Sequence, residues 1–479
     1  MTQDLAPAIP LPPLLRVAVV GAGGPSGLVA VAQLLAAGVE PSLILAFESR
    51  NKAGGVWNFD AEPGQQHVHW RKDGPPVVRS DAELAADGAI GPSAMYDRLR
   101  TNLPNQIMNY RFSPFAKDTP VFPTHQQVAT YLQDYSKRHN LNDLIRWGVR
   151  VTSVYHTPGG GEADRWTVQT TEGTYTVSHV ILANGHYNEP YLPSIPGLDA
   201  FTGQVVHARW WRNPRRFRGE NVVVVGSRAS GSDIARELAQ DDESTDVPDG
   251  ADGAGGSGSS ARTIYQSVRG YKPGDKVWDD ALPWTKRIHV VPEIVEIQPS
   301  PSGSVLVLEN GQRLKGIKAI VFATGYLFSY PFATKAPFDE YPLTTSLAAA
   351  EDGLPAAGGQ DILNLNNTDT FYVPDPTLAL IGLHYQVNPF PLGEATARLI
   401  ARSFTRGQVP PLPPLLRFTD RPGEVKIGAP AEFDNQDAWL RAIGEGGDEG
   451  TPECWPRSSE ATREARVNAL KMRKAELGY

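Results

Sequence analysis

The sequence predicts an α/β protein that contains two dinucleotide-binding folds. A short apolar run at 16–20 ends in glycines and is followed by an apolar-periodic stretch at 28–37, the pattern of a strand, a tight turn and a helix. The same succession returns in the apolar run 221–225 and the helical stretch 232–240. A second strand at 43–47 follows the first helix and ends in an acid. Because this succession builds a dinucleotide fold, the predicted class is α/β with two Rossmann-like domains.

Composition limits the classes of function. The 479 residues include 45 Lys and Arg against 53 Asp and Glu, a net charge of −8, which argues against nucleic acid or an anionic membrane as a partner. Cys454 is the only cysteine, which excludes an intramolecular disulfide, a Cys-x-x-Cys pair and a cysteine-based zinc site. His67 and His69 lie in a polar stretch without a nearby acid, so we expect no metal site. The chain shows neither a signal-peptide pattern nor a membrane-spanning apolar run, and we expect a cytoplasmic location.

The first glycine turn is the best-defined motif. Residues 21–27 read Gly-Ala-Gly-Gly-Pro-Ser-Gly. In a dinucleotide fold the first glycine permits the sharp exit from the strand, the second lets the backbone approach a pyrophosphate, and the third lets helix and strand pack closely. This turn is one residue longer than the usual G-x-G-x-x-G pattern. Two interpretations stay open: the turn is bulged, or Gly24 takes the place of Gly23.

Acidic and basic residues follow the turns where a nucleotide would need them. Glu48 ends the second strand, at about the distance where an acid accepts hydrogen bonds from ribose hydroxyls. The second turn, residues 226–231, reads Gly-Ser-Arg-Ala-Ser-Gly and has Arg228 at the middle glycine position, where its guanidinium suits a phosphate. Ser267 and Arg269 follow the next strand, and a hydroxyl with a guanidinium suits the 2′-phosphate of NADPH.

Two stretches outside the turns have clear local patterns. Residues 124–138 are typical of an amphipathic helix, with Thr124 as its N-cap. Residues from about 241 to 260 are acidic and then rich in Gly and Ser, and their lack of apolar side chains predicts a disordered surface insertion within the second fold. The strand at 263–266 is then expected to be the second strand of that fold.

Further motifs occur in the order found in one enzyme family. Residues 54–57 read Gly-Gly-Val-Trp, residues 101–104 read Thr-Asn-Leu-Pro, and residues 201–211 fit F-x-G-x-x-x-H-x-x-x-W. Residues 183–185 and 323–325 read Ala-Asn-Gly and Ala-Thr-Gly, similar to paired links between domains. Taken together, these motifs make the chain resemble the flavin-containing monooxygenases of the soluble microbial and fungal type.

The resemblance implies FAD and NADPH as cofactors, with O2 and a small molecule as substrates. NADPH would reduce FAD, and a flavin C4a-hydroperoxide would pass one oxygen atom to a soft nucleophilic nitrogen or sulfur. Asn102 is then the implied catalytic residue, because its amide donates a hydrogen bond to a peroxide oxygen without supplying acidity. The alternative for Asn102 is a simple turn cap before Pro104. The implied cofactor-binding residues are Gly21, Gly23, Gly24, Pro25, Ser26, Gly27, Glu48, Val56, Trp57, Thr101, Asn102, Leu103, Val151, Gly226, Ser227, Arg228, Ala229, Ser230, Gly231, Ser267 and Arg269.

The expected domains are an FAD domain from residues 1–200 and 330–479 and an inserted NADPH domain at 201–329. Trp211 leaves a second reaction open, because Trp at this position is usual in the Baeyer–Villiger branch, which acts on ketones. A non-catalytic nucleotide-binding protein is the other alternative, whereas a flavin disulfide reductase would need a cysteine pair that the chain lacks. His207 is either a packing residue of the linker or part of the chemistry. A homodimer stays open as the oligomeric state.

Overall fold

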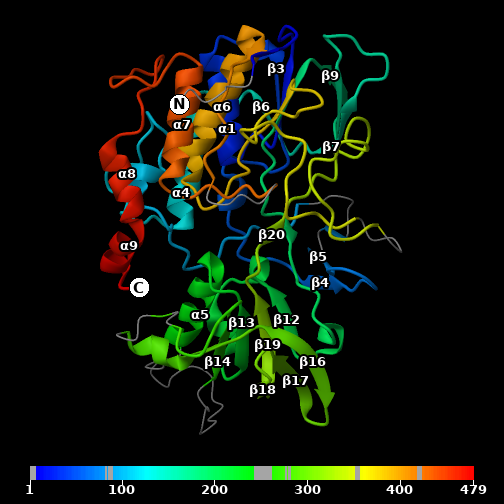
Figure 1. The fold of residues 1–479 in the computed structure, drawn as a ribbon, viewed down its shortest axis with the longest axis vertical. Coiled ribbons are helices and arrows are strands. Elements are labelled where there is room, and N and C mark those ends of the chain that lie inside the picture. The colour runs from blue at the N-terminus through cyan, green and yellow to red at the C-terminus, as the bar shows by residue number, and fades with distance from the viewer. Residues whose placement is uncertain are drawn as a thin grey trace.

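The computed structural model describes residues 7–80, 83–84, 90–241, 262–275, 278, 282–350, 356–417 and 423–479. The chain forms two lobes, and a parallel sheet lies in each of them (Figure 1). The insertion predicted within the second fold lies outside the described residues, except for Asp241 at its start.

The sheet of the upper lobe in Figure 1 has five strands, all parallel. Alternate residues of each strand point to opposite faces, and both faces are buried, which explains why these strands are continuous apolar runs. In sheet order, the strands are β21 (Leu378–Leu380), β10 (His179–Leu182), β2 (Val17–Val20), β3 (Ile44–Glu48) and β6 (Ile145–Trp147).

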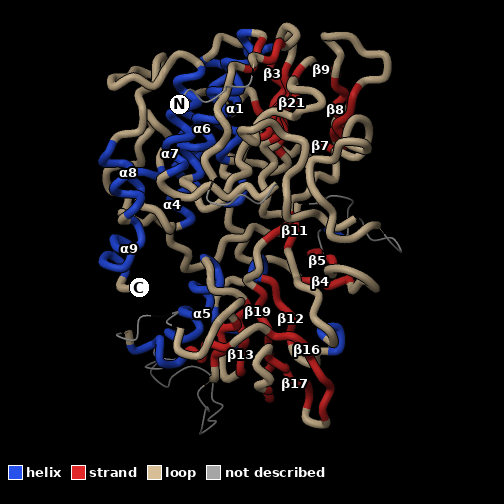
Figure 2. Tube along the Cα trace, in the orientation of Figure 1, coloured by secondary structure: helices blue, strands red, loops and turns tan. Residues whose placement is uncertain are grey.

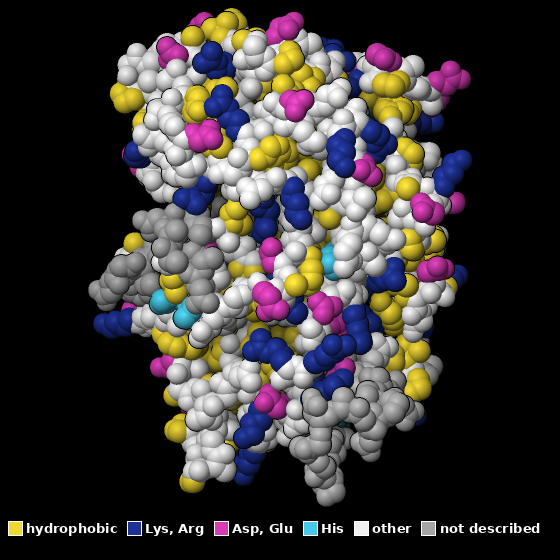
Figure 3. Space-filling view, turned by 180° about the vertical axis from the view of Figure 1, so that it is seen from behind, with side chains coloured by type: hydrophobic (Ala, Val, Ile, Leu, Met, Phe, Trp, Pro, Cys, Tyr) yellow, Lys and Arg dark blue, Asp and Glu magenta, His cyan; other side chains and the backbone are white. Residues whose placement is uncertain are grey.

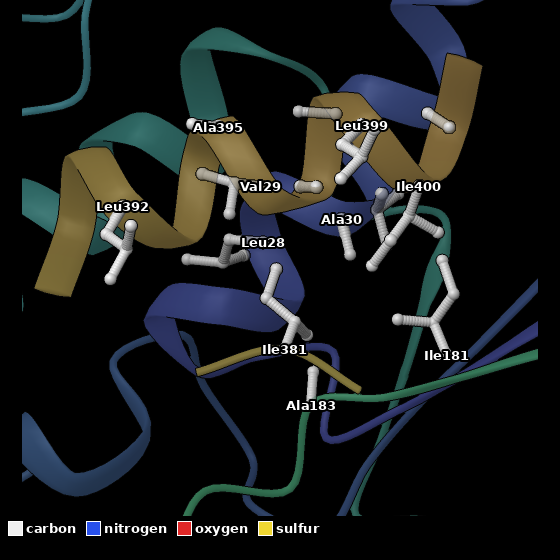
Figure 4. Close-up of a cluster of buried hydrophobic side chains, with 14 of the residues drawn as sticks. Leu28, Val29, Ala30, Ile181, Ala183, Ile381, Leu392, Ala395, Leu399 and Ile400 are labelled. Carbon is white, nitrogen blue, oxygen red and sulfur yellow. The ribbon is translucent and has the colours of Figure 1, made fainter. Parts of the chain in front are cut away.

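Two helices, α1 (Pro25–Ala36) and α6 (Pro389–Arg406), pack on one face of this sheet. Figure 4 shows Leu28 of α1 and Leu392 of α6 in one buried cluster above Ile181 of β10. Each such side chain, when fully buried, stabilises the fold by roughly 1.5–3 kcal/mol. This cluster holds the first glycine turn, at the start of α1, firmly against the sheet.

The sheet of the lower lobe repeats the arrangement. Its strands are also all parallel and lie in the order β12 (Gln204–His207), β19 (Ile317–Phe322), β13 (Asn221–Val225), β14 (Ile264–Ser267) and β15 (Ile288–Val291). Helix α5 (Ala229–Asp241) follows β13. The expected second strand of this fold is confirmed as β14, which pairs in parallel with β13.

The predicted start of the disordered insertion at residue 241 is wrong. Asp241 is the last residue of α5 and is buried. Its carboxylate accepts hydrogen bonds from Arg218 at 3.0 Å and from Arg262 at 2.9 Å. Arg218 precedes β13 and Arg262 precedes β14, so Asp241 belongs to the folded lobe.

The remaining elements surround the two sheets (Figure 2). The helix predicted at 124–138 is confirmed as α4 (His125–Arg138), and Thr124 forms a capping box with Gln127. The other helices are α3 (Asn105–Met108), α7 (Ala431–Ala442), α8 (Glu460–Val467) and α9 (Ala469–Leu477). Two antiparallel pairs are β1 (Ile9–Pro10) with β22 (Gln408–Val409), and β4 (Gln66–His69) with β5 (Val77–Ser80). Two three-stranded antiparallel sheets have the orders β7 (Val151–His156), β8 (Trp166–Thr170), β9 (Thr174–Val177) and β16 (Ile294–Ser300), β17 (Gly303–Leu308), β18 (Arg313–Lys315).

Two chain segments connect the lobes and pair with each other. Strand β11 (Glu189–Pro190) lies antiparallel to β20 (Tyr326–Leu327). His207 is fully buried beside this connection, where its Nδ1 accepts from the backbone N–H of Arg209 and its Nε2 lies 2.9 Å from the carbonyl oxygen of Gly325. Burial lowers the pKa of His207 to about 3, so the ring is neutral and its Nε2–H donates to Gly325. These contacts make His207 a packing residue of the connection.

The surface and the helices add two further observations. On the face seen in Figure 3, Lys and Arg side chains are interspersed with Asp and Glu. Within the described ranges, no helix is both long and apolar enough to cross a membrane.

Candidate active site

A cleft of about 2740 Å³ lies between the two lobes, and residues of both glycine turns line it. Pockets for small molecules are usually about 300–1,000 Å³, so this cleft has room for more than one ligand. The turns follow β2 and β13, at the carboxyl ends of the strands, which is where open α/β sheets bind ligands.

The first turn requires glycine at its two ends. Gly21 has a φ of +81°, and a Cβ atom there would lie 2.7 Å from the carbonyl oxygen of Ala183. A Cβ on Gly27 would lie 2.1 Å from the carbonyl oxygen of Gly21. The first and last glycines therefore have the two packing roles that the motif predicts.

The extra residue of this turn changes which middle glycine faces the cleft. A Cβ on Gly23 would lie 2.6 Å from Cγ of Glu48 and 2.7 Å from Cζ3 of Trp147, so this position is enclosed. Gly24 is the N-cap of α1 and lines the cleft, and the nearest atoms to a Cβ there are 3.8 Å or more away. Of the two interpretations, the geometry favours Gly24 in the place of Gly23.

Glu48 is buried at the end of β3, with 5% of its surface exposed, and still lines the cleft. Its Oε2 accepts a hydrogen bond from the N–H of Gly23 and its Oε1 from the N–H of Arg50, each at 2.8 Å. Burial raises its pKa, whereas these hydrogen bonds and the Arg50 charge act in the opposite direction. The acid thus links the glycine turn to the neighbouring strand.

The loop that carries Asn102 is held by its neighbours and not by Asn102. The hydroxyl of Thr101 donates to the carbonyl oxygen of Leu103 at 2.8 Å, and both residues are buried. Asn102 is exposed and lines the cleft, and its amide forms no hydrogen bond with the residues that the structure describes. The turn-cap alternative for Asn102 therefore lacks the hydrogen bond that it requires.

The second turn has the same construction as the first. Gly226 has a φ of +112°, and a Cβ there would lie 2.6 Å from the carbonyl oxygen of Ala323. A Cβ on Gly231 would lie 2.4 Å from the carbonyl oxygen of Gly226. Arg228, which replaces the middle glycine, lines the cleft together with the first residues of α5.

The two residues expected to bind a 2′-phosphate point in different directions. Arg269 lines the cleft with 84% of its side chain exposed, and its Nε lies 3.1 Å from Oε1 of Glu293. Ser267 is 2% exposed, and its hydroxyl donates to the carbonyl oxygen of Pro292 at 3.0 Å. The expected phosphate contact of the Ser267 hydroxyl is wrong, because the proton is already used inside the lobe.

Trp211 lies in the core of the lower lobe and not in the cleft. It is fully buried, it stacks on Phe217 with the ring planes 7° apart, and its Nε1 donates to Oε2 of Glu237 at 3.1 Å. The residue that favoured the Baeyer–Villiger alternative therefore does not contact a ligand in this cleft.

The structure brings most of the predicted site residues to one cleft. The rest are residues of the two glycine turns that do not line the cleft, together with the buried Ser267. Those that line the cleft are Gly21, Gly24, Pro25, Ser26, Glu48, Val56, Trp57, Thr101, Asn102, Leu103, Val151, Arg228, Ala229, Ser230 and Arg269. Those outside its lining are Gly23, Gly27, Gly226, Ser227, Gly231 and Ser267. Sequence reasoning missed Arg209, Asp233 and Arg473, which also line the cleft. Arg209 stands at an unspecified position of the 201–211 motif, and Asp233 and Arg473 lie outside the motifs.

Comparisons with known proteins agree with this geometry. The family model described as flavin-binding monooxygenase-like matches residues 83–247. The chain is 29% identical over 439 residues to the flavin-containing monooxygenase ustF2 of Aspergillus flavus, covering 82% of each chain. It is 27% identical over 468 residues to the flavin-containing monooxygenase iboF of Amanita muscaria, covering 85% of this chain and 82% of the relative.

Solved structures share the fold. The S-allyl-L-cysteine S-oxygenase from Allium sativum superposes with a TM-score of 0.70 at 22% identity, covering 98% of this chain and 94% of that one. Tmm from Pelagibacter sp. superposes with a TM-score of 0.60 at 17% identity, covering 96% of this chain and 86% of that one.

The paired folds and the shared cleft define an oxidoreductase that holds two dinucleotide cofactors. The chain is similar in sequence and in fold to the flavin-containing monooxygenases, a family whose members use FAD and NADPH. The residues present fit both cofactors, since each glycine turn offers a backbone cradle at the carboxyl end of a parallel sheet.

Proposed function

We propose that this flavin monooxygenase transfers one oxygen atom of O2 to a soft nucleophilic nitrogen or sulfur atom of a small molecule, through a flavin C4a-hydroperoxide. The observation that carries the proposal is the amide of Asn102, which lines the cleft that both glycine turns share and has no hydrogen-bond partner among the described residues. FAD supplies the oxygen chemistry when bound, and NADPH supplies the electrons.

The first turn would hold FAD. Gly24 precedes the first turn of α1, so the pyrophosphate would meet free backbone N–H groups and the positive end of the helix dipole. Glu48 lines the same end of the cleft and would accept from the ribose hydroxyls. Val56 and Trp57, in the short helix that starts at Gly55, add apolar surface beside Gly24.

The second turn would hold NADPH. Arg228 lies immediately before α5 and Arg269 follows β14, and both guanidiniums line the cleft. Arg269 is exposed, so its charge is free to pair with a 2′-phosphate in exchange for its surface contact with Glu293. This distribution supports Arg269 as the residue that distinguishes NADPH from NADH.

Two side chains that line the cleft, Asn102 and His186, suit an oxidant that must not be protonated early. Asn102 donates through a neutral amide, which stabilises a negatively charged or polar oxygen without transferring a proton. His186 also lines the cleft, and burial lowers its pKa to about 4. His186 is therefore neutral at pH 7 and contributes no strong acid.

Trp211, the residue that left a ketone substrate open, is buried away from the cleft and so does not favour a ketone through contact there. The garlic protein of similar fold is named for the S-oxygenation of S-allyl-L-cysteine, which makes a thioether the first probe. We propose Asn102 as the catalytic residue because its amide lines the cleft that both glycine turns share.

The proposal is tested with the purified, FAD-loaded protein. Reduced protein is mixed with O2 in a stopped-flow instrument with and without NADP⁺, and product formation is measured with a thioether, a tertiary amine and a cyclic ketone. We expect a long-lived hydroperoxide absorption band, with sulfoxide and N-oxide as products. Esters or lactones as the main products, or reduced flavin that is reoxidised without the band, would overturn the proposal.

A further inference from the structure

Helices α8 and α9 form an arm that the sequence motifs left without a role. Figure 1 shows this arm running down one side of the upper lobe toward α5 of the lower lobe. Arg466 and Val467 of α8 line the cleft, as do Ala469, Leu470 and Arg473 of α9. The arm is therefore part of the cleft wall and connects the two lobes.

Arg473 joins the Asn102 loop to the lower lobe with a single guanidinium. The side chain is buried, with 8% of the residue exposed. Its Nε donates to the carbonyl oxygen of Thr101 at 3.3 Å, and its Nη2 donates to Oδ1 of Asp233 at 3.3 Å. Thr101 directly precedes Asn102, and Asp233 lies on α5, the helix that begins at the second glycine turn.

Asp233 is also bonded to the chain that leads to Asn102. Its Oδ2 accepts from the hydroxyl of Tyr96 at 2.6 Å, and its Oδ1 accepts from Nη2 of Arg236 at 3.1 Å. Burial and the Asp233 charge raise the pKa of Tyr96 well above its usual range, so the hydroxyl keeps its proton and remains a donor. Two separate contacts thus connect α5 with the segment that carries Asn102.

The end of the arm is anchored independently of these hydrogen bonds. The ring of Tyr479 lies 3.6 Å from the Arg236 guanidinium and 5.0 Å from the Arg473 guanidinium, measured to the ring centroid. Tyr479 also packs against the core of the lower lobe. At the other end of the arm, Arg463 of α8 pairs with Asp434 and Asp437 of α7 in the upper lobe.

We propose that Arg473 is a positioning residue that holds Asn102 in register with the NADPH-binding end of α5. The proposal rests on the proposed function for the role of Asn102. The planar fork of a guanidinium sets a fixed separation between its two acceptors, so Thr101 and Asp233 cannot move apart without leaving buried polar groups unpaired. Coupling of NADPH consumption to oxygen transfer then depends on this contact.

The experiment compares Arg473→Ala, Arg473→Lys and the matched control Arg463→Ala. The control removes an arginine with two ion pairs from the same arm, but Arg463 does not line the cleft. Two readouts are taken: hydrogen–deuterium exchange of the peptides that contain residues 99–104 and 229–241, and H2O2 released per NADPH consumed with a thioether present. Exchange is measured on the FAD-loaded protein without turnover.

We expect faster exchange of both peptides in Arg473→Ala and about a tenfold rise in H2O2 per NADPH. Arg473→Lys should be intermediate, because one ammonium keeps the charge but not the fork geometry. Arg463→Ala should match the wild-type protein in both readouts. If Arg473→Ala does not fold, which its circular dichroism would reveal, Arg473→Lys carries the comparison.

Two results would overturn the proposal: unchanged exchange at residues 99–104, or an H2O2 rise in Arg463→Ala as large as in Arg473→Ala. If the wild-type protein oxygenates no substrate, the proposed function fails by itself. The exchange readout then still decides whether Arg473 holds the loop.

Discussion

The indole Nε1 of Trp211 donates a hydrogen bond to Oε2 of Glu237 at 3.1 Å, inside the core of the lower lobe. Burial raises the pKa of Glu237 to about 7, while the Arg236 charge and this hydrogen bond oppose the shift. Trp211, the residue that left the Baeyer–Villiger reaction open in the sequence, is therefore a hydrogen-bond donor to the buried acid Glu237.

The raised pKa of Glu237 predicts that the contribution of this side chain to stability decreases as the pH rises. The folded state holds this proton up to about pH 7 and the unfolded chain only to about pH 4.5, so at Glu237 the folded state binds more protons in that window. The contribution of Glu237 to the free energy of unfolding should fall between these two values. Glu237→Gln removes the ionisation and should be more stable than the wild-type protein at pH 8 by on the order of 2 kcal/mol, with little difference at pH 5.

Urea unfolding at pH 5 and pH 8 measures this difference. The matched control is Glu309→Gln, which makes the same change at an exposed side chain of the same lobe. Equal stability changes at the two pH values would show that Glu237 is ionised in the fold.

We expect an added methyl group to have different effects at Gly23 and at Gly24, the two middle glycines of the first turn. Gly23→Ala would place a Cβ 2.6 Å from Glu48 and 2.7 Å from Trp147, so we expect a lower melting temperature, equivalent to about 1–3 kcal/mol. Gly24→Ala has protein atoms no closer than 3.8 Å, so the apoprotein should melt like the wild type. Its methyl group lies where a pyrophosphate would approach, and FAD content should fall.

Melting temperature and bound FAD per protein, measured on both variants, separate these effects. A Gly24→Ala protein that retains full FAD content would remove Gly24 from the proposed pyrophosphate site.

Asn102→Ala should uncouple NADPH consumption from oxygen transfer without loss of FAD. The side chain makes no hydrogen bond to the described part of the chain, so its removal should leave the melting temperature and FAD content unchanged. Loss of one preorganised donor costs about 10²–10³ in rate in other enzymes, and we expect H2O2 to become the main product. Product and H2O2 are quantified together, and wild-type coupling in Asn102→Ala would exclude Asn102 from the chemistry.

Arg269→Ala should weaken NADPH more than NADH. A charge-assisted contact to phosphate contributes about 1.5–3 kcal/mol, so KM for NADPH should rise roughly tenfold to a hundredfold while KM for NADH changes little. Glu293→Gln is the matched variant, because it frees Arg269 from its surface partner and should leave KM for NADPH equal or lower. Parallel changes in KM for both nucleotides would show that Arg269 does not read the phosphate.

Local patterns in the sequence predicted the elements that form through interactions between residues close in sequence. The two strand–turn–helix successions, the acid Glu48 and the Thr124 cap all depend on neighbours a few residues away, because hydrophobic periodicity and capping act within one or two turns of chain.

Tertiary structure decided the contacts between segments that are far apart in the chain. Gly24 faces the cleft because Glu48 and Trp147 enclose Gly23, and Ser267 turns inward because the Pro292 carbonyl accepts its proton. Arg473 meets Thr101 only because the arm of α8 and α9 crosses between the lobes. The spacing of residues in the sequence does not predict these contacts. The direction of a side chain and the identity of its distant partner depend on how the helices and sheets pack against one another.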